Sequence, residues 1–395
     1  MRISTSQIFS QSLTQLNSSL NDVAKLNEIN SSQKRINRPS DDPAGMGQVV
    51  ELRAYDQTLS GYVDNCGVAS DYLSTADEVL NDASEIIAAA MELAEQGASE
   101  TYTETQLQAM ALEMESYLES LFAIANTQTG SDYLFAGDDI GDNAYEFGLG
   151  VTLPGETLSN ASFVELSGEV DSTVTVQFTS DGTIGTDAID YQYSTDNGET
   201  WTTATLAAGD TVLDLGDAQV EMATGTVVSA ADGEGEGEFY LRQAVVYTGS
   251  DTAMSVSISE NTSVDMTTVG STIFGGLDDT GTPYDGANLF ETISDCIVCL
   301  ETGDYDGVAD CLEVLGDAHE VVETGAANLG ARETKVSYTE QSLSLVQSLT
   351  ANSISREEDA DATQIIVELE QANYVYEAVL NSSADIMKMS LLNYI

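Results

Sequence analysis

Hydrophobic side chains near the start of the chain recur at alternating steps of four and three residues. The residues on this frame are Phe9, Leu13, Leu16, Leu20 and Val23. Such spacing is typical of a coiled-coil seam, because it keeps apolar side chains on one side of a helix. Beyond Val23 the frame reaches asparagines at positions 27 and 30. We therefore predict an amphipathic helix that starts near residue 6 and pairs with another helix.

The end of the chain carries a broader apolar face. One heptad frame contains Ile366, Leu369, Tyr376, Leu380 and Met387. A second frame beside it repeats every seven residues and contains Ile365, Ala372, Val379 and Ile386. A face this wide predicts more than one partner helix. The alternative is an ordinary helix pair within one chain. The Ser- and Asn-rich remainder of both ends favours segments that fold only when their partners are present.

The stretch "INRPSDDPAG", residues 36–45, predicts the end of one helix and the start of another. Pro39 disfavours helical backbone at Arg38, so the first helix should end before it. Asp42 is a good N-cap, and Pro43 suits the first helical position because its missing N–H would be unpaired there. Asp41 and Asp42 also lie favourably at the positive end of the second helix dipole.

Long helical patterns follow, and after them the hydrophobic pattern changes from helical to strand-like. We predict helices from about 43 to Gly97 and from about 103 to 128; helices this long are typical of rods or bundles. From about residue 130 apolar residues alternate with polar ones, which predicts strands. The triplet Asp196-Asn197-Gly198 predicts a hairpin turn. Helix returns near Ala287 and persists to the end, with breaks near Gly303 and around residues 353–357.

These patterns predict an α+β protein. We expect an elongated helical bundle built from the N- and C-terminal segments, with an inserted mainly-β domain. The expected terminal coiled-coil segments are 1–42 and 353–395. The expected helical rod domain, which carries β-hairpins, comprises 43–145 and 246–352, and the inserted β domain comprises 146–245.

Charge is distributed very unevenly along the 395 residues. The net charge is −56, which argues against nucleic acid as a partner, because phosphates would be repelled. Residues 1–53 are nearly neutral at +1 and residues 332–395 carry −6, whereas residues 54–331 hold 52 acids and only Arg242 as a base. Acidic surfaces favour solubility, and in a saline habitat their repulsion is screened. The nearly neutral ends are where copies of the chain could meet with least repulsion.

No apolar run is long enough for a membrane-spanning helix, and we expect no membrane partner and no cleavable secretory signal.

Four candidate ligands or nucleophiles lie in the second half of the chain. Cys296, Cys299, Cys311 and His319 have the spacing C-x2-C-x11-C-x7-H, which resembles that of zinc ligands. However, Cys296 and His319 also fall on apolar helical stripes, where Cys behaves as a small hydrophobic residue. Core thiols are the favoured interpretation, and a metal site and a disulfide remain open. We therefore expect no metal and no cofactor.

Catalytic interpretations have little support. His319 is the only histidine, so a Ser–His or Cys–His relay would depend on one residue of a helical stripe. The acidic segment "DGEGEGE", residues 232–238, lacks the strand-to-helix setting of a phosphate loop and provides no complete calcium loop. We therefore expect no enzymatic activity and assign no catalytic residue.

Five segments in order resemble one family. "KRINRPSDDPAG" (34–45) is similar to the conserved loop of the flagellin superfamily, and "SDYLFAGDD" (131–139) resembles the segment after its third helix. The segment 246–276 resembles the return into the helical domain. "ANLGARETKV" (327–336) and the final helix resemble the C-terminal helices. The chain resembles the superfamily over about 1–145 and 246–395, and Arg38-Pro39 and "YLFAGDD" favour its hook–filament junction branch over filament flagellin.

The resemblance implies a structural role in the bacterial flagellum. It implies type III export, an extracellular location at the hook–filament junction, and a ring of copies of this chain. The implied partners are the hook-side junction protein (hook-associated protein 1), flagellin and an export chaperone. Filament flagellin is the alternative, and a surface adhesin-type module is a weaker one. Lys34, Arg35 and Arg38 would then face an anionic neighbouring subunit. The predicted assembly interface comprises Phe9, Leu13, Leu16, Leu20, Val23, Arg35, Arg38, Asp41, Asp42, Ile366, Leu369, Tyr376, Leu380 and Met387.

Overall fold

The computed structural model describes residues 5–155, 157–170, 172–231 and 235–392, with the side chains of residues 5, 6, 8 and 386–392 left out. The chain forms two compact units. The first unit combines residues up to Asp64 with those from Glu340 onward, and the second comprises Asn65–Thr339. Of the helices in the described part of the chain, none is both long and apolar enough to cross a bilayer.

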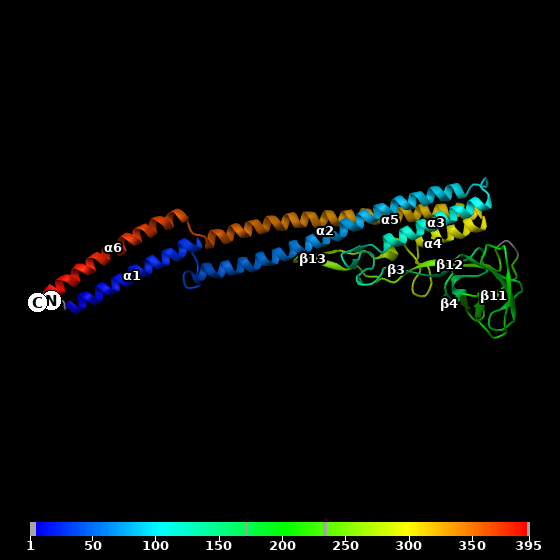
Figure 1. Ribbon diagram of the computed structural model, residues 1–395, viewed down its shortest axis with the longest axis horizontal. Helices are drawn as coiled ribbons and strands as arrows, with labels where there is room; N and C mark the ends of the chain where they lie inside the picture. The colour runs from blue at the N-terminus through cyan, green and yellow to red at the C-terminus, as the bar shows by residue number, and fades with distance from the viewer. Residues whose placement is uncertain (1–4, 156, 171, 232–234, 393–395) are drawn as a thin grey trace. The chain divides into compact units, whose positions relative to one another are not determined.

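The first unit is helical. Helices α1 (Thr5–Ser32) and α6 (Ala362–Leu392) run side by side (Figure 1). Helices α2 (Pro43–Gly97) and α5 (Tyr305–Glu358) are shared by the two units. Residues 43–64 of α2 and 340–358 of α5 belong to the first unit, and the rest of both helices belongs to the second. The predicted start of α2 at Pro43 and its end at Gly97 are both confirmed.

Helix α1 ends before Arg38, as predicted, but earlier than Pro39 alone requires. The helix stops at Ser32, well before Arg38, because Gln33 adopts a left-handed backbone with φ of 60°. The next residue, Lys34, pairs through its backbone with Asp359 in an isolated antiparallel bridge. The long-range backbone pairing therefore ends the helix before Pro39 can act.

Two shorter helices pack together in the second unit. Helix α3 (Glu104–Ala125) starts with a capping box between Thr103 and Gln106, and helix α4 (Leu289–Thr302) is capped by the Asn288 side chain. Helix α4 ends at Gly303, whose φ of 72° is the left-handed conformation that favours glycine. The predicted return of helix near Ala287 and the predicted break near Gly303 are therefore confirmed. The break predicted around 353–357 falls slightly later, at residues 359–361.

The β region lies between α3 and α4. Its largest sheet is antiparallel, in the order β3-β12-β5-β7-β8, and a second has the order β4-β10-β9. The pairs β1-β2, β11-β6 and β13-β14 form two-stranded ladders. The strands are β1 (Gln128–Thr129), β2 (Asp132–Tyr133), β3 (Tyr145–Thr152), β4 (Phe163–Gly168), β5 (Val174–Phe178), β6 (Gly182–Thr183), β7 (Ile189–Ser194), β8 (Thr202–Leu206), β9 (Val212–Asp214), β10 (Ala218–Met222), β11 (Val227–Val228), β12 (Glu238–Tyr247), β13 (Ser255–Ser259) and β14 (Thr262–Asp265).

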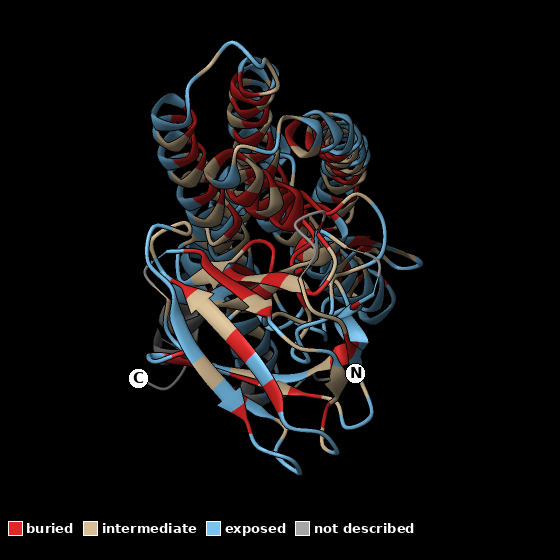
Figure 2. Cartoon of the chain, turned by 90° about the vertical axis from the view of Figure 1, so that its right-hand side faces the viewer, coloured by how far each residue is buried: buried red, intermediate tan, exposed pale blue. Residues whose placement is uncertain are grey.

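The predicted strand pattern is confirmed at several places. Val174, Val176 and Phe178 are buried together on β5, and Ile189 and Tyr191 are buried on β7. Figure 2 shows strands of the β region with buried bands beside intermediate or exposed ones. Hairpin β7–β8 turns through Asn197 and Gly198, whose φ values of 53° and 86° are those of the predicted turn. The helical chain with an inserted mainly-β region agrees with the predicted fold class.

Candidate assembly site

The loop between α1 and α2 is joined by backbone hydrogen bonds to the break between α5 and α6. The Arg35 amide donates to the Glu358 carbonyl at 2.7 Å, and the Ala360 amide donates to the Gln33 carbonyl at 3.1 Å. Together with the Lys34–Asp359 bridge, these bonds hold the two helix breaks against each other. We call residues 33–42 with 357–361 the junction loop pair.

A buried carboxylate lies at the centre of the junction loop pair. The side chain of Glu358 is only 7% exposed. Its Oε1 accepts a hydrogen bond from Lys34 Nζ at 2.8 Å, and both oxygens accept from Arg53 Nη2 at 2.6 Å. Burying a carboxylate is costly unless it is paired in this way. Neither Glu358 nor Arg53 was identified from the sequence, because they lie 305 positions apart and belong to no periodic pattern.

Asp41 and Asp42 organise the loop and the start of α2. Asp41 Oδ2 accepts from the Arg38 amide at 2.9 Å, and Asp42 Oδ1 accepts from the Gly45 amide at 3.0 Å. The hydrogen bond from Arg38 lowers the pKa of Asp41, and the hydrogen bond from Gly45 lowers the pKa of Asp42. Asp42 therefore caps α2 as predicted. Both aspartates have a local role that does not depend on assembly.

Close packing fixes the same turn. Ile36 is 2% exposed, and a Cβ atom added to Gly45 would lie 2.8 Å from its Cδ1 and 2.7 Å from Asp42 Oδ2. A side chain at position 45 would therefore displace the loop. The glycine allows α2 to start directly against Ile36.

The three cations within residues 33–42 all have acidic partners within the chain. Lys34 pairs with Glu358, and Arg38 Nη2 lies 2.9 Å from Glu28 Oε1. Arg35 Nη1 lies 3.4 Å from Asp42 Oδ2, and its Nη2 donates to the Glu357 carbonyl at 2.7 Å. These contacts give the cations a role inside the chain that was not predicted. Their predicted contact with a neighbouring subunit stays a proposal.

The pair of α1 and α6 follows the predicted frames only in part, because the frame on α1 is shifted and that on α6 combines the two predicted frames. The least exposed positions again step by four and three. On α1 they are Ser12, Leu16, Ser19, Val23, Leu26 and Asn30, and on α6 they are Ile365, Leu369, Ala372, Tyr376, Val379 and Ser383. We call these positions the inner seam. Of the predicted interface residues, Leu16, Val23, Leu369 and Tyr376 lie on it.

The other predicted apolar residues are turned away from the inner seam. Phe9, Leu13 and Leu20 are 40–48% exposed on α1, and Ile366 and Leu380 are 50% and 45% exposed on α6. We call these five residues the outer stripe. The side chain of Met387 lies outside those that the structure describes. The sequence analysis missed Val367, Tyr374 and Val375, which are also exposed on α6.

The structure separates His319 from the three candidate cysteine ligands. His319 Nε2 lies 2.7 Å from Ser84 Oγ, and His319 lies two turns beyond Cys311 along α5. Among the described residues, no group of three or more His, Cys, Asp and Glu side chains could hold a metal ion. Cys296 and Cys311 are buried, as expected of core thiols.

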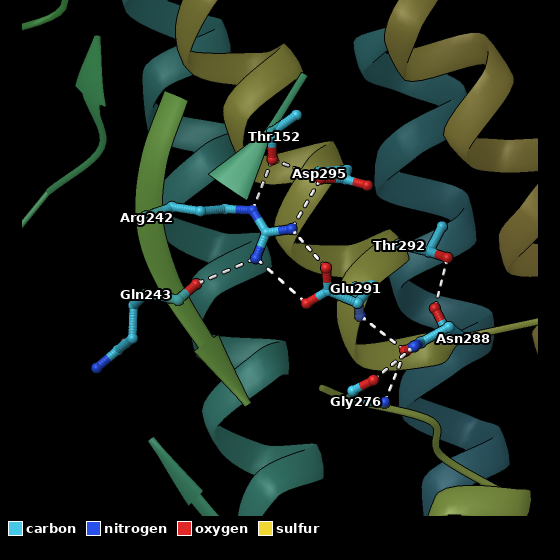
Figure 3. Close-up of polar contacts among 8 residues, drawn as sticks. All are labelled: Thr152, Arg242, Gln243, Gly276, Asn288, Glu291, Thr292 and Asp295. Atoms are coloured by element: carbon cyan, nitrogen blue, oxygen red, sulfur yellow. Dashed lines mark hydrogen bonds and ion pairs between the residues drawn. The ribbon is translucent and has the colours of Figure 1, made fainter. Parts of the chain in front are cut away.

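A buried ion-pair network joins the largest sheet to α4 in the second unit (Figure 3). Arg242 on β12 is 3% exposed, and its Nη2 lies 3.0 Å from Glu291 Oε2 and 2.9 Å from Asp295 Oδ1. Its Nε donates to Thr152 Oγ1 on β3 at 2.7 Å. The only Lys or Arg residue between positions 54 and 331 therefore fixes two strands to a helix.

A fold in which paired N- and C-terminal helices flank an inserted β region defines a flagellin-type protein. The model for the bacterial flagellin N-terminal helical region matches residues 3–139, and that for the C-terminal helical region matches 312–395. These matches cover more than half of the chain, which belongs to the bacterial flagellin family. The predicted membership of the flagellin superfamily is thus confirmed.

Curated relatives have flagellar names. The chain is 29% identical to flagellar hook-associated protein 3 of Salmonella typhimurium over 138 residues, which are 35% of this chain and 44% of the relative. It is 32% identical to the flagellar filament 41 kDa core protein of Borreliella burgdorferi over 104 residues, 26% of this chain and 31% of the relative. The chain therefore matches less than half the length of each. The predicted resemblance to hook-associated protein 3 is confirmed.

A solved structure shares the fold. It is a Vibrio parahaemolyticus protein assigned as a flagellar hook-associated protein. Its TM-score is 0.50 at 13% identity, covering 81% of this chain and 100% of that chain. At this identity the likeness supports the fold alone.

Proposed function

We propose that this protein is a structural component of the bacterial flagellum that joins the hook-side junction protein to the flagellin filament. The observation that supports this proposal is the outer stripe, which remains exposed after α1 and α6 have paired with each other. Family membership and the hook-associated relatives give this surface its context. The role is mechanical and involves no catalysis and no cofactor.

The inner seam contributes little stability to the pair of α1 and α6 when no neighbouring helix is present. Serines occupy seam positions 12, 19 and 383, and Ser19 and Ser383 are both 7% exposed. Large apolar residues on the outer stripe would each contribute about 1.5–3 kcal/mol if they passed from full exposure to full burial. Ordering the backbone costs about 1–2 kcal/mol per residue. The terminal pair therefore gains its stability when neighbouring helices cover the outer stripe.

Charge supports the terminal segments as the place where copies meet. Residues 1–53 carry +1, whereas residues 54–331 carry −51. Repulsion between neighbouring copies is smallest where the net charge is smallest. The proposed partners are copies of this chain in a ring, hook-associated protein 1, flagellin and an export chaperone. The proposed location is extracellular, at the hook–filament junction.

The proposed interface retains all the predicted residues. Those on the inner seam would hold the terminal pair, and those on the outer stripe, with Met387, would contact neighbouring subunits. The conformation of the junction loop pair that neighbouring subunits contact would be maintained by Arg35, Arg38, Asp41 and Asp42. Exposed ion pairs contribute only about 0–1 kcal/mol each, so these charges would adjust register rather than drive assembly.

Deletion of the gene tests the proposed function. We expect cells without filaments that release soluble flagellin into the medium. Complementation with Leu13→Ser/Leu20→Ser should fail to restore filaments although the variant is folded and exported. The matched control is Gln15→Ser/Asn21→Ser, which changes two exposed polar residues of the same helix. Intact filaments in the deletion strain, or full rescue by the stripe variant, would contradict the proposal.

Filament flagellin is the second candidate, because the Borreliella relative is a filament protein. A filament subunit is abundant and its purified form polymerises alone. A junction subunit is scarce and stays unpolymerised. Quantification of the protein in sheared flagella, together with sedimentation of the purified chain, separates the two candidates.

A further inference from the structure

Three of the four cysteines converge where α4 turns into α5. Cys296 and Cys299 lie three residues apart on α4, which places both on one face of that helix. Cys311 lies on the facing part of α5. The Cys311 thiol shares hydrogen bonds with both Cys296 and Cys299. None of these three cysteines is in a disulfide, and neither is Cys66 on α2.

A glycine makes room for this contact. A Cβ atom added to Gly307 would lie only 2.7 Å from Cys299 Sγ, so this sulfur occupies the space that a side chain at position 307 would fill. Cys311 is one helical turn beyond Gly307 on the same face of α5. The sulfur of Cys299 is therefore held next to Cys311 by the close approach of the two helices.

The three thiols differ in access. Cys296 is completely buried and Cys311 is 9% exposed, whereas Cys299 is only partly buried. An oxidant from solution therefore meets Cys299 first. The hydrogen bond with Cys311 and then burial raise the pKa of Cys299, so its reactive thiolate is scarce at neutral pH. Oxidation should accordingly be slow at neutral pH and faster at alkaline pH.

The geometry points to a redox site in which Cys299 and Cys311 form a disulfide that cross-links α4 to α5. The oxidant is a small disulfide such as oxidised glutathione. The Cys299 thiolate attacks one of its sulfurs, displaces a thiolate and forms a mixed disulfide. The Cys311 thiolate then attacks the Cys299 sulfur and expels the second thiolate. Two protein thiols lose two protons and two electrons, and the small disulfide gains both to become two thiols.

The cross-link would restrict the unfolded chain and stabilise the turn between α4 and α5. This inference does not depend on the proposed function, although the extracellular location proposed above is where protein disulfides persist. Cys296 would remain as a buried thiol beside the new bond.

The test uses the purified full-length chain with oxidised glutathione at neutral and alkaline pH. Titration of thiols after denaturation should fall from four per chain to two. Peptide mapping should find Cys299 joined to Cys311, and the melting temperature should rise. Cys299→Ser should keep its remaining thiols under the same conditions. Cys296→Ser and the control Cys66→Ser should oxidise as the unaltered chain does.

Several outcomes would overturn the inference. One such outcome is a folded chain that retains four thiols while the urea-unfolded chain consumes the oxidant. Another is a peptide map that shows a persistent mixed disulfide, a link through Cys296 or Cys66, or a link between two chains. One zinc ion per purified chain that protects the thiols would do the same. None of these measurements involves flagella, so failure here leaves the proposed function untouched.

Discussion

Replacement of Glu358 by Gln should loosen the junction loop pair without changing its backbone. Gln has nearly the same size, and the Glu358 carbonyl keeps its hydrogen bond from Arg35. The new amide group has no charge and only one acceptor oxygen for Lys34 and Arg53, which approach the present carboxylate at 2.8 and 2.6 Å. The substitution therefore removes one negative charge and leaves two cations without their partner.

The size of the effect follows from the exposure of the partners. Breaking a fully buried ion pair costs about 3–5 kcal/mol, because the remaining charge is left without water. Here the side chains of Lys34 and Arg53 are 41% and 47% exposed, so water can solvate them after the change. We therefore expect a loss of about 1–3 kcal/mol in the local opening free energy of the loop pair.

Amide hydrogen exchange is the suitable assay, because the chain has two units and one global unfolding free energy would not describe it. The Arg35 and Ala360 amides report the opening of the junction loop pair. The control is Glu357→Gln, whose side chain is 43% exposed and whose carboxylate lies 4.0 Å from Arg35. An exposed pair of this kind should contribute only about 0–1 kcal/mol.

A double-mutant cycle completes the test. Combining Glu358→Gln with Arg53→Met should cost less than the sum of the two single changes, by about 1 kcal/mol or more. Additive effects, or equal exchange in Glu358→Gln and Glu357→Gln, would refute the role of Glu358 as the centre of the ion-pair cluster.

Three further perturbations address other features. Gly45→Ala should destabilise the start of α2 by about 1–3 kcal/mol, because its Cβ would overlap Ile36. Gly47→Ala, which meets nothing within 4 Å, should stabilise the helix by up to about 1 kcal/mol, and amide exchange in the first turns of α2 checks both variants. The lowered pKa values of Asp41 and Asp42 mean that their stabilising effect is complete above the unfolded-state pKa of about 4 and is lost as pH falls through the lower folded-state values. The protection of the loop amides, taken relative to the intrinsic exchange rate at each pH, should therefore fall there, and less so in Asp41→Asn. Protection that does not change with pH would contradict the assignment. Arg242→Met should cost about 3–5 kcal/mol in the opening free energy that amide exchange reports for β12 and α4, because it leaves Glu291 buried without its partner. Adding Glu291→Leu should recover much of that loss, and no recovery would show that packing, not charge, dominates.

Local signals predicted much of the fold. Pro43 and Gly97 bound α2 because both act on the backbone next to them, and Asn197 and Gly198 form the turn because they tolerate positive φ. The pairing face of α1 was harder to predict. Leu16 and Val23 belong both to the predicted frame and to the inner seam, and the stripe alone does not show which neighbouring residues face the partner. Small serines on the seam carry almost no hydrophobic signal.

Contacts between distant segments were beyond sequence reasoning. Gln33 has a left-handed backbone because Lys34 must pair with Asp359, and nothing near Gln33 in the sequence indicates this. Glu358 and Arg53 are ordinary surface residue types whose pairing requires two helix breaks to meet. The cysteines were correctly expected to be largely buried, but their convergence depends on the small volume of Gly307 on the facing helix.

The adjacent strands β3 and β12 have a consequence for how the β region can vary. They pair over eight consecutive positions, from Tyr145 with Tyr247 to Thr152 with Tyr240. The segment between them therefore leaves and returns at neighbouring points. Lengthening or exchanging it changes neither the spacing nor the register of the two strands at its base. This base is consequently a natural position for grafting: a fluorescent protein or an affinity peptide inserted there would be displayed without altering the path of the helices.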